Sequence, residues 1–132
     1  MEFPIAYGLS KTGLPLILSE DNVCFIIDTG ATNNTLFRFV YEHFKDKFKL
    51  LDSTCRTMGI EGHYKETPVI KATFNFGGVD YTSTFSVLDA TDAIAQVQEE
   101  TGVQIHGVLG VEFLMENKWI IDFETYIIKC ND

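Results

Sequence analysis

Two long strand-like segments joined by a pair of glycines constrain the fold of this chain most strongly. Residues 68–76 end at Gly77 and Gly78, and residues 79–88 follow as the second arm of a hairpin, because glycine pairs favour tight turns between strands. Shorter strand-like runs at residues 5–9, 14–19 and 23–28 are separated by turn-forming residues. We therefore predict a β-meander in the first quarter and a mainly β fold overall.

The strand pattern is interrupted where apolar side chains recur at every fourth position. These side chains are Leu36, Val40, Phe44 and Phe48. Their period predicts one amphipathic helix over residues 36–48. Asn33, Asn34 and Thr35 precede it and are residue types that cap helices.

Five elements are expected after the long hairpin. They are a short helix or loop over residues 91–101 that closes at Gly102, a strand near 103–109, a short helix over 110–117, and strands at 119–123 and 126–130. A predicted hairpin tip lies earlier, at residues 58–62, where Gly59 and Gly62 stand between extended segments. No linker or repeat divides the chain, so residues 1–132 are assigned to a single domain.

The charge balance excludes some partners. The chain carries 19 acidic and 10 basic side chains, for a net charge of −9, whereas nucleic-acid binding depends on Lys and Arg that neutralise phosphates. The N-terminus lacks the basic patch and apolar run of a signal peptide, and no apolar stretch is long enough to span a bilayer. We expect a cytoplasmic protein that binds neither nucleic acid nor membrane.

The cysteines and histidines follow no metal-ligand spacing. The cysteines are Cys24, Cys55 and Cys130, and the histidines are His43, His63 and His106. We interpret the cysteines as reduced and mostly buried. No metal and no cofactor is expected.

Asp28 is the sharpest candidate for chemistry. An apolar run at residues 25–27 leads directly into it, and the small, turn-prone residues Thr29, Gly30 and Ala31 follow. A strand therefore places the carboxylate and a loop exposes it. The same pattern also suits an aspartate that only caps a turn.

Four features in chain order resemble the retropepsin family, the retroviral and retrotransposon type of aspartic protease. They are Asp28-Thr29-Gly30-Ala31 after an apolar strand, the glycine-bounded tip Gly59-Ile60-Glu61-Gly62, the run Val108-Leu109-Gly110 followed by a short helix, and the strand Trp119-Ile120-Ile121-Asp122-Phe123. The resemblance covers nearly the whole chain. It implies a closed β-barrel or sandwich with one amphipathic helix and short helices, acting as a two-fold homodimer.

The resemblance implies an aspartic endopeptidase, a hydrolase that cleaves peptide or protein substrates. This chemistry needs two carboxylates that face one water, one ionised and one protonated. The chain has only one Asp-Thr-Gly sequence. The second Asp28 must therefore come from a twin chain across a two-fold axis.

Other residues receive roles through the same resemblance. Thr29 would bond across the dimer axis, Gly30 would let the substrate backbone approach, and Val108 would help to line side-chain pockets. Met58, Gly59, Ile60, Glu61 and Gly62 would form a flap over the substrate. Thr32 and Val111 stand where retroviral members often have an acidic residue and an arginine, so the dimer must be stabilised differently.

Two other functions remain open from the sequence. One is a catalytically silent dimer of the same fold that binds peptides or serves as a scaffold. The other is nucleotide binding, because residues 28–32 also resemble the phosphate loop of actin-like sugar kinases and chaperones. The short chain and the lack of a Gly-x-x-x-x-Gly-Lys loop disfavour nucleotide binding.

Overall fold

A computed structural model describes residues 1–58 and 64–130. Its elements in chain order are β1 (Glu2–Pro4), α1 (Ala6–Thr12), β2 (Leu16–Leu18), β3 (Cys24–Ile27), β4 (Thr35–Phe37), α2 (Arg38–His43), the 3-10 helix η1 (Lys45–Lys47), β5 (Lys49–Met58), β6 (Tyr64–Phe76), β7 (Val79–Leu88), α3 (Thr91–Thr101), β8 (Gly107–Leu109), α4 (Val111–Asn117), β9 (Ile120–Asp122) and β10 (Ile127–Lys129).

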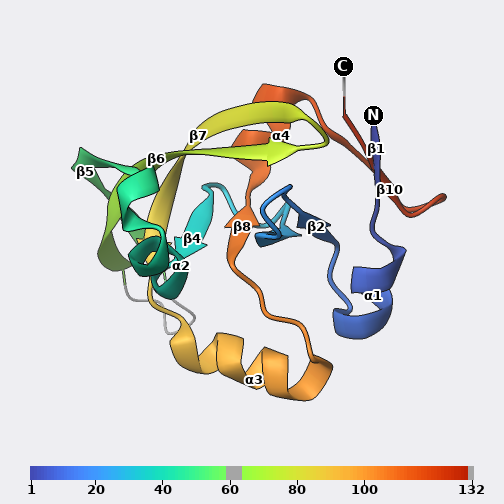
Figure 1. Ribbon diagram of the computed structural model, residues 1–132, viewed down its shortest axis with the longest axis horizontal. Coiled ribbons are helices and arrows are strands. Elements are labelled where there is room, and N and C mark those ends of the chain that lie inside the picture. The colour runs from blue at the N-terminus through green and yellow to red at the C-terminus, as the bar shows by residue number, and fades with distance from the viewer. Residues whose placement is uncertain (59–63, 131–132) are drawn as a thin grey trace.

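The strands form two sheets (Figure 1). The larger has seven strands in the order β2-β3-β8-β4-β7-β6-β5, and the smaller has three in the order β1-β10-β9. The prediction of a mainly β fold is confirmed. The expected closed barrel is not found among the described strands, because β2 and β5 stand at opposite ends of the strand order and do not pair with each other.

Aromatic side chains fill the core against the larger sheet. Phe25 of β3 is fully buried, and its ring centroid lies 4.9 Å from that of Phe74 and 6.0 Å from that of Phe85. A second buried cluster packs Ile94 of α3 against Cys24 and Ile105. The strand that leads to Asp28 is therefore held from both sides by apolar packing, which makes it a rigid support.

The prediction of a strand over residues 5–9 is wrong, because Ala6–Thr12 form α1. Gly13 ends this helix with a left-handed backbone (φ 76°), and its N–H donates to the Leu9 carbonyl at 2.9 Å. Gly13 is thus a helix C-cap and not the turn between two strands. The predicted meander is reduced to the antiparallel pair β2 and β3.

The prediction of one helix over residues 36–48 is also wrong at its start. Leu36 belongs to β4, which pairs in parallel with β7 and antiparallel with β8. The helical part is limited to α2 and η1, and α2 begins after Phe37 with no side-chain cap. Leu36 is buried, as the four-residue period predicts, but a strand can bury it as well as a helix can. Pairing of its backbone with β7 and β8 favours the strand.

The long hairpin and the elements predicted after it are confirmed, with bounds that differ at some ends, whereas the predicted hairpin tip falls mostly on residues 59–63, outside the described part. β6 and β7 form the long hairpin, and Gly77 and Gly78 have φ of 63° and 90° at its turn. α3 closes at Gly102, and β8, α4, β9 and β10 follow as expected. Cys24 and Cys130 are buried as predicted, whereas the side chain of Cys55 lies outside the described part.

Candidate active site

Asp28 directly follows β3, at the point where the chain leaves the sheet. β3 lies between β2 and β8, and the Asp28 N–H donates to the Leu109 carbonyl of β8 at 3.0 Å. Phe25 and Ile27 of the same strand are buried, but Asp28, Thr29 and Gly30 are exposed. The sheet thus fixes the backbone of Asp28 while solvent reaches its carboxylate.

The loop after β3 orients the Asp28 carboxylate. The Gly30 N–H donates to Asp28 Oδ1 at 2.9 Å, and the Ala31 N–H donates to the Asp28 carbonyl at 3.2 Å. A Cβ atom at position 30 would lie 3.2 Å from Asp28 Oδ1, which is tighter than ordinary van der Waals contact. Glycine at this position leaves the carboxylate room to accept the bond.

The start of α4 holds this loop in place. The Val111 N–H donates to the Ala31 carbonyl at 2.7 Å, and the Glu112 N–H donates to the Thr32 carbonyl at 3.1 Å. These are orphan N–H groups of a helix N-terminus, so the loop satisfies them. A Cβ atom on Gly110 would lie 2.6 Å from the Asn33 carbonyl oxygen. Only glycine permits this close approach.

Asn34 is a positioning residue, and the prediction that it caps a helix is wrong. Its side chain is buried, and Oδ1 accepts the Gly110 N–H at 2.9 Å. Its Nδ2 donates to Ser83 Oγ at 3.0 Å and to the Thr84 carbonyl at 3.2 Å. One amide therefore joins the Asp28 loop, the start of α4 and β7. Its place six residues after Asp28, ahead of a predicted helix, carried no signal for this role.

The remaining candidate residues, predicted to bind substrate, belong to β8 and to the segment after β5. Val108 is half-buried in β8, pairs with Ile26 and Thr35, and packs against the cluster that contains Cys24 and Ile105. Its role in a substrate pocket stays a prediction. Met58 ends β5, and Gly59, Ile60, Glu61 and Gly62 lie outside the described residues.

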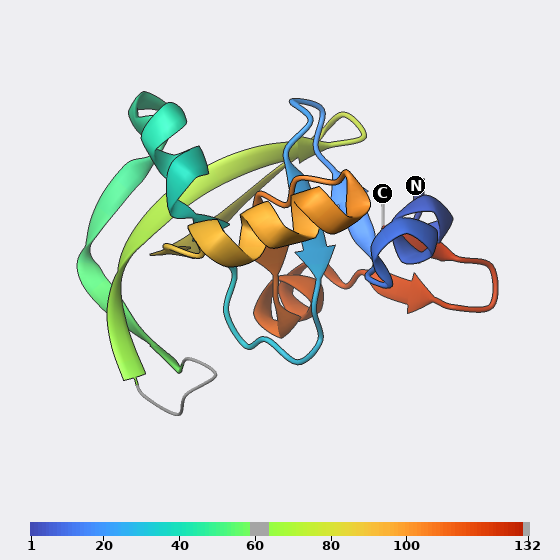
Figure 2. The same ribbon diagram turned by 90° about the horizontal axis from the view of Figure 1, so that it is seen from below.

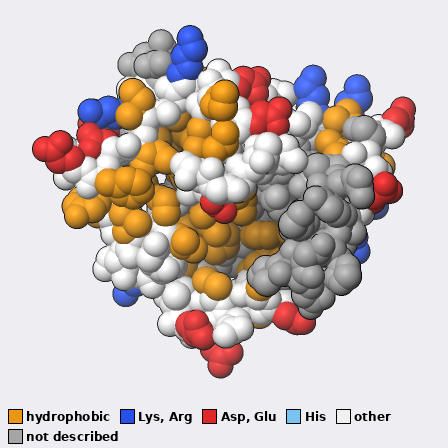
Figure 3. All heavy atoms as spheres, turned by 180° about the vertical axis from the view of Figure 1, so that it is seen from behind, with side chains coloured by type: hydrophobic (Ala, Val, Ile, Leu, Met, Phe, Trp, Pro, Cys, Tyr) orange, Lys and Arg blue, Asp and Glu red, His pale blue; other side chains and the backbone are white. Residues whose placement is uncertain are grey.

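The ends of β5 and β6 that flank these residues project to the same side of the molecule as the Asp28 loop and α4 (Figure 2). Figure 3 views this side and shows hydrophobic side chains gathered across it. The Asp28 loop and the ends of β5 and β6 therefore lie on one side of the molecule, and that side carries many hydrophobic side chains.

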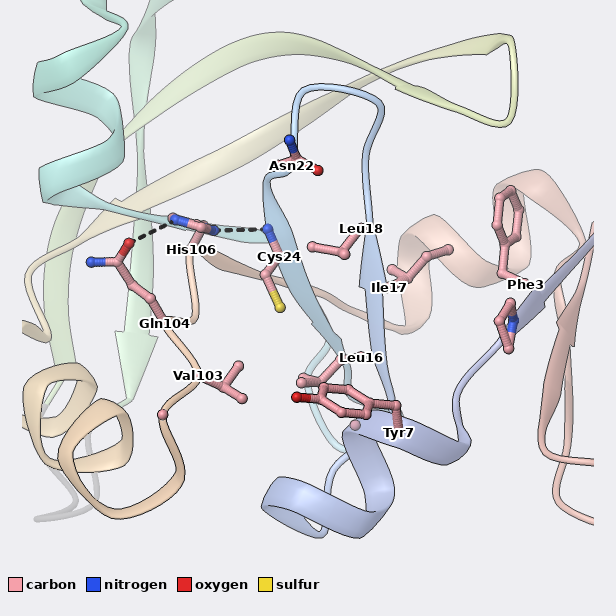
Figure 4. Close-up of a pocket in the computed structure, with 13 residues that line it drawn as sticks. Phe3, Tyr7, Leu16, Ile17, Leu18, Asn22, Cys24, Val103, Gln104 and His106 are labelled. Atoms are coloured by element: carbon pink, nitrogen blue, oxygen red, sulfur yellow. Dashed lines mark hydrogen bonds between the residues drawn. The ribbon is translucent and has the colours of Figure 1, made fainter.

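An apolar cavity of about 570 Å³ lies elsewhere, against α1, β2 and the segment before β8 (Figure 4). Within it, His106 Nδ1 accepts the Cys24 N–H at 2.8 Å, and His106 Nε2 lies 3.2 Å from Gln104 Oε1. Burial lowers the pKa of His106 and raises the pKa of the Cys24 thiol to about 11. None of the predicted site residues that the structure describes lines this cavity.

Asp122, at the end of β9, has a local structural role. Its Oδ1 accepts the backbone N–H groups of Glu124 and Thr125, and its Oδ2 pairs with Lys129 Nζ at 3.3 Å. Hydrogen bonds from Thr125, first from its side chain and then from its backbone, lower the pKa of Asp122. These bonds hold the β9–β10 turn.

No group of three or more His, Cys, Asp or Glu side chains among the described residues has the arrangement of a metal site. Within the same residues, no helix has the length and apolar character needed to cross a membrane.

Comparison with known proteins gives a structural match. No protein-family model matches the chain, and no curated protein matches it. Among solved structures, it is similar to the crystal structure of the retroviral protease-like domain of Ddi1 from Leishmania major, with a TM-score of 0.60 and 15% sequence identity. The match covers 90% of this chain and 86% of that domain. The chain therefore has a retropepsin-like fold.

Proposed function

We propose that this protein is an aspartic endopeptidase whose active form is a homodimer. The observation that carries the proposal is Asp28: an exposed carboxylate at the end of a buried strand, oriented by the Gly30 N–H at 2.9 Å. The retropepsin-like fold supports the proposal, because aspartic proteases of the retroviral type place their catalytic aspartate after a strand of this fold. A single chain supplies one such carboxylate, and the reaction requires two.

The proposed reaction uses two Asp28 side chains that share one proton. The ionised carboxylate removes a proton from a water molecule, and the resulting hydroxide attacks the peptide carbonyl carbon. The protonated carboxyl donates its proton to the carbonyl oxygen, giving a tetrahedral diol. Transfer of a proton to the amide nitrogen and cleavage of the C–N bond then release a carboxylic acid and an amine.

The expected substrate is an extended peptide with apolar side chains beside the cleaved bond. The hydrophobic side chains gathered on the side of the molecule that holds the Asp28 loop support this class (Figure 3). Gly30 would leave space for the peptide backbone beside the catalytic group, because a side chain at this position would first meet the Asp28 carboxylate. Met58 to Gly62 would close over the peptide, and Thr29 would contact the partner copy.

The substitution Asp28→Asn tests the proposal. The amide retains an oxygen that accepts the Gly30 N–H but cannot exchange a proton with water. We expect cleavage of an apolar peptide at mildly acidic pH to fall by at least about 10²-fold, the usual scale of acid–base catalysis. Circular dichroism and sedimentation should be unchanged. Asp21→Asn, an equal charge change on an exposed turn, should keep full activity.

Cleavage by Asp28→Asn at the wild-type rate would contradict the proposal. A wild-type dimer that binds a pepstatin-type inhibitor without cleaving peptides would also contradict it and would favour the silent peptide-binding or scaffold dimer. Titration with this inhibitor, combined with sedimentation, separates the two functions.

A further inference from the structure

The cavity of about 570 Å³ against α1 and β2 has no part in the chemistry proposed at Asp28. Its volume lies within the range of ligand-binding pockets, about 300–1,000 Å³. Residues of β1, α1, β2 and β3, of the turn after β2 and of the segment between α3 and β8 line it. None of the described residues in this lining is Asp, Glu, Lys or Arg.

The backbone of β2 has a free edge at this cavity. β2 stands at the end of the larger sheet, and its outer side pairs with no described strand. On its inner side it pairs with β3, and the Ser19 N–H just after it donates to the Val23 carbonyl at 3.0 Å. Bonded and non-bonded residue pairs alternate along an antiparallel ladder. The backbone N–H and C=O groups of Leu16 and Leu18 therefore point away from β3.

The cavity surrounds this free edge, because side chains from both faces of β2 line it. Ile17 belongs to the main core cluster, against which Phe3 packs, whereas Leu16 packs against the cluster that contains Cys24. Figure 4 shows Ile17 and Phe3 on one side of β2 and Leu16 and Leu18 on the other. Successive side chains of an extended segment point to opposite faces, so a segment laid along β2 fills both halves of the cavity.

The edge of β2 is not protected against such an addition. Sheets usually block their free edges with charged side chains or proline, and β2 consists of Leu, Ile and Leu. Tyr7 of α1 is 72% exposed and Leu18 of β2 is 56% exposed at the cavity. Exposed apolar side chains that gather around a hollow mark interaction surfaces in soluble proteins.

The charges around the cavity select the kind of segment that fits. A charged side chain inside the uncharged lining would lose its hydration without gaining a partner. Outside, Glu20 and Asp21 are exposed beside Asn22, which lines the cavity. Asp80 is linked to the same turn through Asn75, whose carbonyl accepts the Glu20 N–H at 2.8 Å and whose amide donates to Asp80 at 2.8 Å. A basic residue at this end of the segment complements these carboxylates.

We propose that β2 binds an extended peptide segment of a partner protein as an added strand, with apolar side chains in the cavity and a Lys or Arg beside Glu20 and Asp21. Antiparallel pairing is the more stable arrangement, which puts the basic residue at the amino end of the segment. In this mode, backbone hydrogen bonds supply affinity and the pockets for alternate side chains supply selectivity. The site is separate from Asp28, so the inference goes beyond the proposed function.

A fluorescein-labelled peptide in which two lysines precede a run of Val, Leu and Thr residues tests the site by fluorescence anisotropy. The wild type should bind this peptide, and Leu18→Lys should bind it at least about tenfold more weakly, because an edge lysine blocks strand addition and repels the basic end. Leu50→Lys is the matched control. Leu50 is 58% exposed and lies in β5, at the other end of the same sheet, so this variant should bind as the wild type does.

Two altered peptides test the backbone pairing and the charge separately. N-methylation of every residue in the apolar run should abolish binding, because the added strand loses its donors, whereas methylation of alternate residues leaves one edge intact and should preserve it. Replacement of the two lysines by glutamates should weaken binding at low salt, and the difference should shrink as salt rises.

The outcomes that overturn the proposal are distinct from those that bear on the protease. They are a wild type that does not bind the lysine peptide, Leu18→Lys that binds it with wild-type affinity, and a fully N-methylated peptide that still binds, which would show a cavity that takes side chains alone. Conversion of a wild-type dimer to monomer by Leu18→Lys would show that a second copy occupies β2. Peptide cleavage by Leu18→Lys should be unchanged, since Leu18 lies outside the candidate active site.

Discussion

The geometry of the candidate site depends on Asn34 as well as on the Asp-Thr-Gly sequence at residues 28–30. The apolar run before Asp28 and the small residues after it predict an exposed carboxylate at the end of a strand, because both are local features of the sequence. The role of Asn34 is not visible in the sequence, because its partners Gly110 and Ser83 are distant along the chain. Asparagine before a helical pattern usually indicates a cap. Here the buried amide connects three segments that the sequence does not show to be adjacent.

Asn34→Ala should destabilise the protein, because it leaves the buried Gly110 N–H without an acceptor. An unsatisfied buried donor costs about 1–3 kcal/mol, and we expect the free energy of unfolding in urea to fall by about that amount. Peptide cleavage should fall as well, since the Asp28 loop loses its link to α4.

Asn75→Ala is the control for this prediction. Asn75 also accepts a glycine N–H, that of Gly78, and donates to a side chain, that of Asp80, but these bonds are exposed. Water replaces exposed partners, so the loss of stability should be clearly smaller. Equal losses in the two variants would contradict the proposed role of burial at Asn34.

At the scale of elements, long-range pairing overrode local patterns at two places. Residues 5–9 favoured a strand locally, yet Gly13 ends a helix there. Leu36 fitted a helical period, yet β4 pairs with β7 and β8. Where a long element satisfies its own hydrogen bonds locally, as in α3 and the β6–β7 hairpin, the prediction is confirmed. Short strands depend on partners that periodicity does not identify.

The pairing of β3 with the segment before β8 should depend on pH through His106. Its Nδ1 accepts the Cys24 N–H, so the native state needs the neutral ring. The His106 pKa lies below its ordinary value of 6.5 because the ring is partly buried. The unfolded chain therefore binds a proton more readily, and stability is lost as pH falls through about 6.5 towards the lowered native pKa.

His106→Gln removes this titration and should make stability less sensitive to acid. We expect the wild type to lose more free energy of unfolding between neutral and mildly acidic pH than His106→Gln does, as measured by urea unfolding at each pH. His43→Gln is the control, because His43 lies at a shared small cavity with His106 but is exposed. If His106→Gln and the wild type lose the same free energy of unfolding in acid, titratable groups other than His106 account for the pH dependence.

At the scale of the whole molecule, the net charge of −9 bears on assembly more than on folding. Two like-charged copies repel over a Debye length, which is about 30 Å at 0.01 M salt and about 10 Å at 0.1 M. The proposed dimer should therefore bind more tightly as salt rises over this range. Sedimentation at several salt concentrations measures the dissociation constant directly.

Glu99→Lys, on the exposed surface of α3, reduces the net negative charge of the chain. This variant should show a weaker dependence of dimerisation on salt. A dissociation constant that rises with salt in the wild type would instead indicate that attractive ion pairs dominate the contact.

The sequence by itself determined the mainly β character, the long hairpin, the helix that closes at Gly102 and the position of Asp28 after an apolar strand. These features follow from short-range turn chemistry and side-chain periodicity, which need no knowledge of distant residues. Tertiary structure alone decided that β4 is a strand, that the larger sheet stays open at β2 and β5, and that Asn34 joins the Asp28 loop to Gly110. These outcomes depend on contacts between residues far apart in the chain, since a buried polar group or strand edge is satisfied only by whichever partner the fold brings to it.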